Sequence, residues 1–68
     1  MSQAKKQLEL AIECLQRANR AQQAAFSAYK ELIPEYNTIP MFFDIHNSIE
    51  NVIEQLEELL DSLTESSN

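Results

Sequence analysis

The two side chains of this sequence with the widest chemical range are His46 and Cys14, and each residue type occurs once. A histidine can act as a general base or bind a metal, and both roles need partner groups at defined spacings. The acidic neighbours of His46, Asp44 and Glu50, do not have a known ligand spacing, and the Glu-x-x-His pattern of di-iron bundles is absent. We therefore expect a structural or solvent-edge role for His46, and neither a metal nor another cofactor.

Cys14 would act as a nucleophile only beside an activating base or in a positive environment. Its heptad neighbours are Ala11, Ala18 and Ala21, which are chemically inert. We predict that Cys14 is a small buried apolar residue. Because no nucleophile, base and orienting group can be assembled from these residues, the sequence predicts a protein that is not an enzyme.

Charge is distributed unevenly along the chain, whose net charge is −6. Residues 1–30 contain five basic and two acidic residues, whereas residues 31–68 contain nine acidic residues and no basic one. Attraction between the two halves favours an antiparallel hairpin, although exposed ion pairs contribute only about 0–1 kcal/mol each. The acidic series of the second half is typical of a solvated helix face, and it could also dock on a basic partner. It comprises Glu50, Glu54, Glu57, Glu58 and Asp61.

Two prolines, Pro34 and Pro40, divide the chain into two helical arms. Proline lacks a backbone donor and disfavours helical geometry in the residue before it, so the first helix should end near Leu32. The first arm is rich in Ala, Gln, Leu, Lys and Glu, which are good helix formers, and the chain contains no glycine. We predict one all-α domain over residues 1–68, with helices at about 2–32 and 40–63, a turn at 33–39 and a frayed tail at 64–68.

The start of the second helix has two candidates. Thr38 can cap a helix in which Pro40 occupies the first turn, where its missing donor costs nothing. Asn47, with Glu50 three residues later, has the form of a capping box and offers a later start. We favour one continuous helix from the first site. At the other end, acidic residues oppose the helix dipole, so we expect fraying after Leu63.

Both arms carry an apolar stripe with a seven-residue repeat, in which positions a, d and e are mostly apolar. A domain of this size buries only about 60% of the surface of its unfolded chain, and a single hairpin covers only one side of each stripe. One cysteine excludes an intrachain disulfide. We therefore predict a homodimeric four-helix bundle, while a hetero-oligomer would bury the same residues. The predicted oligomer interface comprises Leu8, Ala11, Ile12, Leu15, Ala18, Phe26, Tyr29, Ile49, Val52, Ile53, Leu56, Leu59, Leu60 and Leu63.

Two polar residues, Asn19 and Gln22, interrupt the first stripe one turn apart. Buried polar groups in such places can set the register or the oligomeric state, at some cost in stability. They could equally lie at a solvated edge, and both interpretations stay open. Folding about the turn should place Phe26 near Ile45, with residues 2–9 overhanging the second arm.

All five aromatic residues lie between positions 26 and 43, so they gather at the turn end of the hairpin. One interpretation is an apolar plug that closes this end of the bundle. The other is a partner-binding tip, because Tyr36 and Phe43 fall outside the stripes and aromatic side chains are common interface anchors. We take Tyr36, Met41 and Phe43 as the candidate tip residues.

The sequence therefore predicts a small cytoplasmic protein–protein interaction module, acting as an adaptor, a chaperone-like subunit or an inhibitor. No apolar run reaches the roughly 20 residues that a membrane-spanning helix needs, and the first residues do not have a signal-peptide pattern. The alternative is nucleic-acid binding through the basic outer side of the first helix, although the acidic net charge disfavours it. The expected architecture is similar in shape, with no shared motif, to the Rop-type RNA-binding hairpin dimers. The basic residues concerned are Lys6, Arg17, Arg20 and Lys30.

Overall fold

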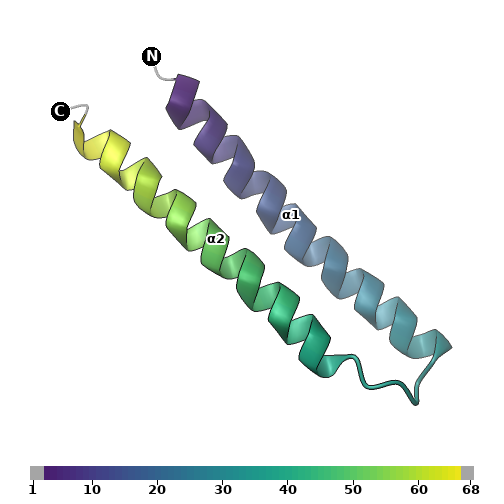
Figure 1. Cartoon of the computed structure of the whole chain (residues 1–68). Coiled ribbons are helices and arrows are strands. Elements are labelled where there is room, and N and C mark those ends of the chain that lie inside the picture. Colours follow the sequence, from purple (N-terminus) through teal and green to yellow (C-terminus); the bar gives the residue numbers. More distant parts are fainter. Residues whose placement is uncertain (1–2, 67–68) are drawn as a thin grey trace.

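The computed structural model describes residues 3–66 of the 68-residue chain, which form two helices. Helix α1 spans Gln3–Leu32 (30 residues) and α2 spans Ile39–Ser66 (28 residues). The helices lie side by side and antiparallel, so the beginning of α1 lies beside the end of α2 (Figure 1). The predicted all-α helical hairpin is confirmed.

The connection between the helices begins with a hydrogen-bonded turn at Pro34. The amide of Ile33 donates to the carbonyl of Tyr29 at 2.9 Å and closes α1. The amide of Tyr36 then donates to the carbonyl of Ile33 at 3.2 Å. Pro34 thus occupies the second position of a four-residue turn, which suits its fixed φ and requires no donor from it. The first helix ends at Leu32, as the proline predicts.

Helix α2 begins at the earlier of its two candidate starts. The amide of Phe42 donates to the carbonyl of Thr38 at 2.9 Å, which is the bond expected of a capping residue. The Oδ1 atom of Asn37 accepts from the amide of Ile39 at 3.2 Å, and so satisfies one of the amides that a helix start leaves free. The helix continues without a break through Asn47, the alternative start.

The C-terminal end of α2 is longer than predicted. Residues 64–66, expected to fray, are helical, and α2 ends at Ser66 rather than near Leu63. The hydroxyl of Thr64 donates to the carbonyl of Leu60 at 3.0 Å, which adds a side-chain bond to the last turns of the helix. The remainder of the expected tail, residues 67–68, lies outside the described residues.

The helices contact each other through heptad positions a and e, whereas the d positions are largely exposed. Ile12 and Ile53, both at e, are 8% and 6% exposed, and Asn19 at e is also buried. Val52 and Leu59, both at d, are exposed. Each helix of a hairpin has one neighbour, which covers only part of a stripe that is three positions wide. The half-buried residues along the contact are Leu8, Leu15, Gln22, Phe26, Phe42, His46, Ile49, Leu56, Leu60 and Leu63.

The helices pair in a different register from the expected one. Phe26 meets Phe42, with ring centroids 5.7 Å apart, three residues before the expected Ile45. Helix α2 starts directly after a short connection, so its first turn already packs on α1. Residues 3–9, expected to overhang, lie beside α2 because the two helices are nearly equal in length (Figure 1). Residue 2 is not among the residues described.

The hairpin is a single layer of two helices. Its Cα extents are 54 × 16 × 10 Å, and its radius of gyration is 16.0 Å, against about 11 Å for a compact chain of this length. The accessible surface is 5364 Å² for a 7.8 kDa chain, about 1,000 Å² above that typical of a folded monomer of this mass. Domains bury their apolar faces between two packed layers, so the single hairpin lacks a second layer.

Candidate protein interaction surface

One face of α1 is lined by small side chains. They recur every three or four residues, which is the spacing of one helix face, and all except the half-buried Ala11 are exposed. Because these side chains have little volume, another helix can approach to the lower end of the usual interaxial range of about 8–10 Å. The residues are Ala11, Cys14, Ala18, Ala21, Ala25 and Ala28.

Helix α2 carries larger apolar side chains on the same face of the hairpin. Met41, Ile45, Val52 and Leu59 follow the same helical spacing and are between 37% and 56% exposed. The two stripes share one face, because Ala25 from α1 and Met41 from α2 line the same hollow. We call the surface formed by these two stripes the uncharged face.

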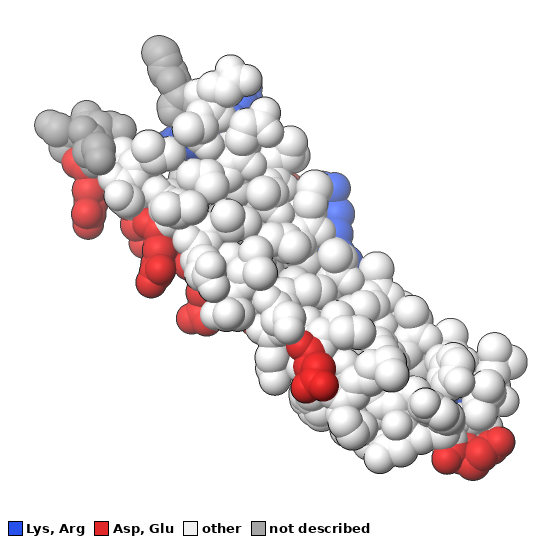
Figure 2. Space-filling model, viewed as in Figure 1, with Lys and Arg blue, Asp and Glu red and all other residues white. Residues whose placement is uncertain are grey.

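The centre of the uncharged face is largely free of Lys, Arg, Asp and Glu, whose side chains gather at its margins (Figure 2). Acidic groups follow the α2 margin, and basic groups lie at the α1 margin (Figure 2). The only ion pair within residues 3–66 joins Arg17 to Glu13 at 3.7 Å in the same helix, so no ion pair there joins the two helices. An apolar patch of this extent marks an association surface.

At the turn end, the uncharged face contains an apolar hollow of about 340 Å³. It is lined by Ala25, Phe26, Tyr29, Tyr36 and Met41. The rings of Tyr29 and Tyr36 pack edge to face with centroids 5.9 Å apart, which holds the turn against α1. Two of the candidate tip residues, Tyr36 and Met41, therefore lie together, and both are about half exposed.

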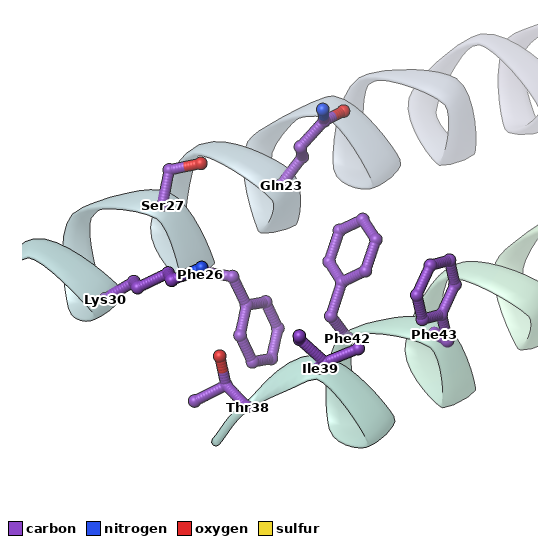
Figure 3. A pocket seen from close by; sticks show the side chains of 8 residues that line it. All are labelled: Gln23, Phe26, Ser27, Lys30, Thr38, Ile39, Phe42 and Phe43. Atoms are coloured by element: carbon purple, nitrogen blue, oxygen red, sulfur yellow. The ribbon is translucent and has the colours of Figure 1, made fainter. Parts of the chain in front are cut away.

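The third candidate tip residue, Phe43, lies apart from the other two. It lines a separate hollow of about 270 Å³, where the rings of Phe26 and Phe42 project from the two helices toward each other (Figure 3). Phe43 packs edge to face on Phe42, with centroids 5.2 Å apart. The aromatic cluster thus combines the two interpretations. Phe26 and Phe42 fill the space between the helices, whereas Tyr36, Met41 and Phe43 remain exposed.

A polar cluster interrupts the contact between the helices. The Nδ2 atom of buried Asn19 donates to Glu50 Oε2 at 3.1 Å. Its Oδ1 atom accepts from Gln22 Nε2 at 3.2 Å and lies 3.1 Å from Nδ1 of His46, which must be the donor. The Oε1 atom of Gln22 is buried without a partner. Because Asn19 meets Glu50 and His46 in only one register, this buried residue helps to set the pairing of the helices.

His46 and Cys14 do not form a catalytic or metal site with other described residues. His46 is half-buried and stacks on Phe42, with centroids 5.7 Å apart and an interplanar angle of 17°. Within residues 3–66, no group of three His, Cys, Asp or Glu side chains could hold a metal ion. The predicted burial of Cys14 is wrong for the single hairpin, because α1 turns its small side chains away from α2.

The predicted oligomer interface falls into two parts. Ile12 and Ile53 are buried within the hairpin, together with eight half-buried residues: Leu8, Ala11, Leu15, Phe26, Ile49, Leu56, Leu60 and Leu63. Four others are exposed: Ala18, Tyr29, Val52 and Leu59. The predicted interface leaves out six further residues of the uncharged face, although the small side chains of α1 and the apolar ones of α2 were the sequence signal for them. They are Cys14, Ala21, Ala25, Ala28, Met41 and Ile45.

Neither helix, over residues 3–66, has the length and hydropathy needed to cross a membrane. Comparisons of this chain with protein-family models, with curated proteins and with solved structures found no match.

Proposed function

We propose that this chain is a small, non-enzymatic protein–protein interaction module that works as a dimer of helical hairpins. The observation that carries the proposal is the uncharged face, where one side of both helices is exposed in the single hairpin. Two hairpins that meet through this face form a four-helix bundle, which supplies the second layer that the fold lacks.

The excess surface of the hairpin is of the size that one partner of a stable dimer buries. The hairpin exposes about 1,000 Å² more than a folded monomer of its mass, and each partner in a standard interface buries about 800 Å². The single hairpin also has few buried apolar side chains, since Ile12 and Ile53 are the two that are buried in the described part of the chain. Such a small core makes a lone hairpin marginally stable, and a second copy would enlarge it.

The surfaces outside the uncharged face would remain available to a further protein. They include Phe43 and the acidic residues of α2, which carries seven acidic residues and no basic one. Tyr36, which lines the turn-end hollow of the uncharged face, is half exposed at the same end of the hairpin. Half-exposed aromatic side chains beside an acidic helix favour a partner that has both an apolar pocket and basic groups.

Replacing both Tyr36 and Phe43 by Ala is expected to reduce the capture of a specific partner at least tenfold. Large aromatic anchors dominate many interfaces, and their truncation often costs more than about 1.4 kcal/mol, which corresponds to a tenfold change in affinity. The measurement is mass spectrometry of proteins retained from the native cell by the immobilised variant and by the unmodified chain. Circular dichroism checks that the variant folds.

The matched control is Glu35→Ala, which changes an exposed, non-aromatic residue of the same turn. It should retain the partner at the level of the unmodified chain. If the double variant retains every partner while its fold is intact, the turn end is not the binding site.

A further inference from the structure

We propose that the two hairpins of the dimer pair with their turns at the same end, so that α1 of each chain lies across α2 of the other. This inference rests on the proposed dimer and specifies its geometry. Its consequence is that the two turn-end hollows adjoin, and each is completed by a residue of the second copy.

Two identical hairpins can meet symmetrically through one face in two ways. If the two-fold axis runs along the hairpin, the turns share one end and α1 faces the partner's α2. If the axis runs across the hairpin, the turns lie at opposite ends, α1 faces the partner's α1, and α2 faces the partner's α2. In both cases all neighbouring helices are antiparallel, so helix direction alone does not choose between them.

Charge favours the arrangement with turns at the same end. Helix α1 contains five basic and three acidic residues, a net charge of +2, whereas α2 contains seven acidic residues, a net charge of −7. Turns at one end bring each basic margin against an acidic margin of the partner. Turns at opposite ends bring the acidic margin of α2 against the same margin of the partner's α2. Repulsion between these like charges would destabilise the dimer.

Arg17, at the outer margin of the uncharged face, agrees with this choice. Because Asn19 bonds to Glu50, Arg17 lies at the height of residues just beyond Glu50, so in the same-end dimer it lies beside the acidic α2 of the partner. The pair of Arg17 with Glu13 is 3.7 Å long and more than half exposed, so it competes weakly for Arg17. With turns at opposite ends, Arg17 would instead lie near its own copy.

Side-chain size favours the same choice. The small residues of α1 would face the Val, Leu, Ile and Met residues of the partner's α2, so both pairs of facing helices combine one small and one large surface. Turns at opposite ends would pair small with small and large with large. Two straight hairpins cannot then keep both helix pairs at their best distance, because the separation follows the facing side chains.

The same-end dimer completes the turn-end hollow with a residue from the second copy. Since Phe26 contacts Phe42, the partner's Met41 would lie at the height of residues between Ala25 and Ala28. These alanines leave room for the Met side chain beside the hollow lined by Tyr29 and Tyr36. The resulting apolar site, contributed by both chains, would exist only in the dimer.

The test is double electron–electron resonance on spin labels attached to single cysteines in the full chain. All variants carry Cys14→Ala, which keeps the stripe of small residues. The label is placed in the turn by Glu35→Cys or near the middle of α1 by Gln16→Cys, and both positions are exposed and lie away from the uncharged face. The turn position distinguishes the two arrangements, and the middle position reports on the existence of a dimer.

With turns at the same end, both labels should give short distances, below about 35 Å, because the two helix layers lie only about 10 Å apart. A long distance in the turn, close to the 54 Å length of the hairpin, with a short distance at Gln16 would show the opposite arrangement and overturn this inference alone. The absence of dipolar coupling at both positions would show a monomer, and would overturn the proposed dimer as well.

Discussion

Replacing Val52 by Asp is expected to leave the hairpin helical and to separate the dimer. Val52 lies near the middle of α2 on the uncharged face and is 43% exposed in the single hairpin, so an Asp there stays hydrated in the monomer. In the dimer each copy would bury one carboxylate without a partner, at a cost of several kcal/mol per site. Because the interface is symmetric, this cost occurs twice, and the dissociation constant should rise more than about 10³-fold.

Size-exclusion chromatography with light scattering measures this change. The matched control is Asn47→Asp, which adds the same charge to an exposed position of α2 outside the uncharged face. Substitutions at such surface positions usually change stability by less than about 0.5 kcal/mol, so the control should remain a dimer. A Val52→Asp variant with unchanged mass would show that the hairpins do not meet through this face.

Replacing Asn19 by Ala is expected to lower the free energy of unfolding by about 1–3 kcal/mol. The change removes the acceptor of Gln22 and His46, which are both half-buried, and the donor to Glu50. Buried polar atoms left without partners carry most of the cost. Glu50 is exposed and can bond to water instead, so its share is small.

Urea unfolding followed by circular dichroism, at one fixed protein concentration, measures the Asn19 effect. Asn47→Ala is the control, because it has the same gain in helix propensity, about 0.5 kcal/mol, at an exposed position. Equal stability of the two variants would mean that the polar cluster contributes nothing, and that the register of the helices is set by apolar packing.

The limits of both helices follow from local rules that can be applied to the sequence. Pro34 stops α1 at Leu32 because it lacks a donor and sits in the turn that follows. Thr38 accepts the bond expected of a capping residue. The end of α2 was less predictable, because acidic residues oppose the helix dipole there and the helix nevertheless continues to Ser66.

The pairing of the helices could not be derived in the same way. The heptad pattern predicts a stripe three positions wide, but it does not say which edge of the stripe faces the other helix and which remains exposed. The structure turns a and e inward and leaves Val52 and Leu59 at d exposed. Asn19 shows the same limit. Its burial depends on the register in which the two helices pair, and side-chain contacts along the whole hairpin determine that register.

The candidate site was predicted in part for the same reason. Tyr36 and Phe43 fall outside the stripes, which makes them candidates together with Met41, and all three are exposed. Their separation into two groups depends on helix rotation, which places Met41 and Phe43, two residues apart, in different hollows. Only the three-dimensional arrangement shows that Met41 belongs to the same face as the alanines of α1.

Sedimentation equilibrium of the unmodified chain shows directly whether a second copy covers the uncharged face. We expect a mass of twice the 7.8 kDa of one chain at micromolar concentration, with dissociation only on dilution. A helical, cooperatively folded monomer of 7.8 kDa throughout that range would contradict it.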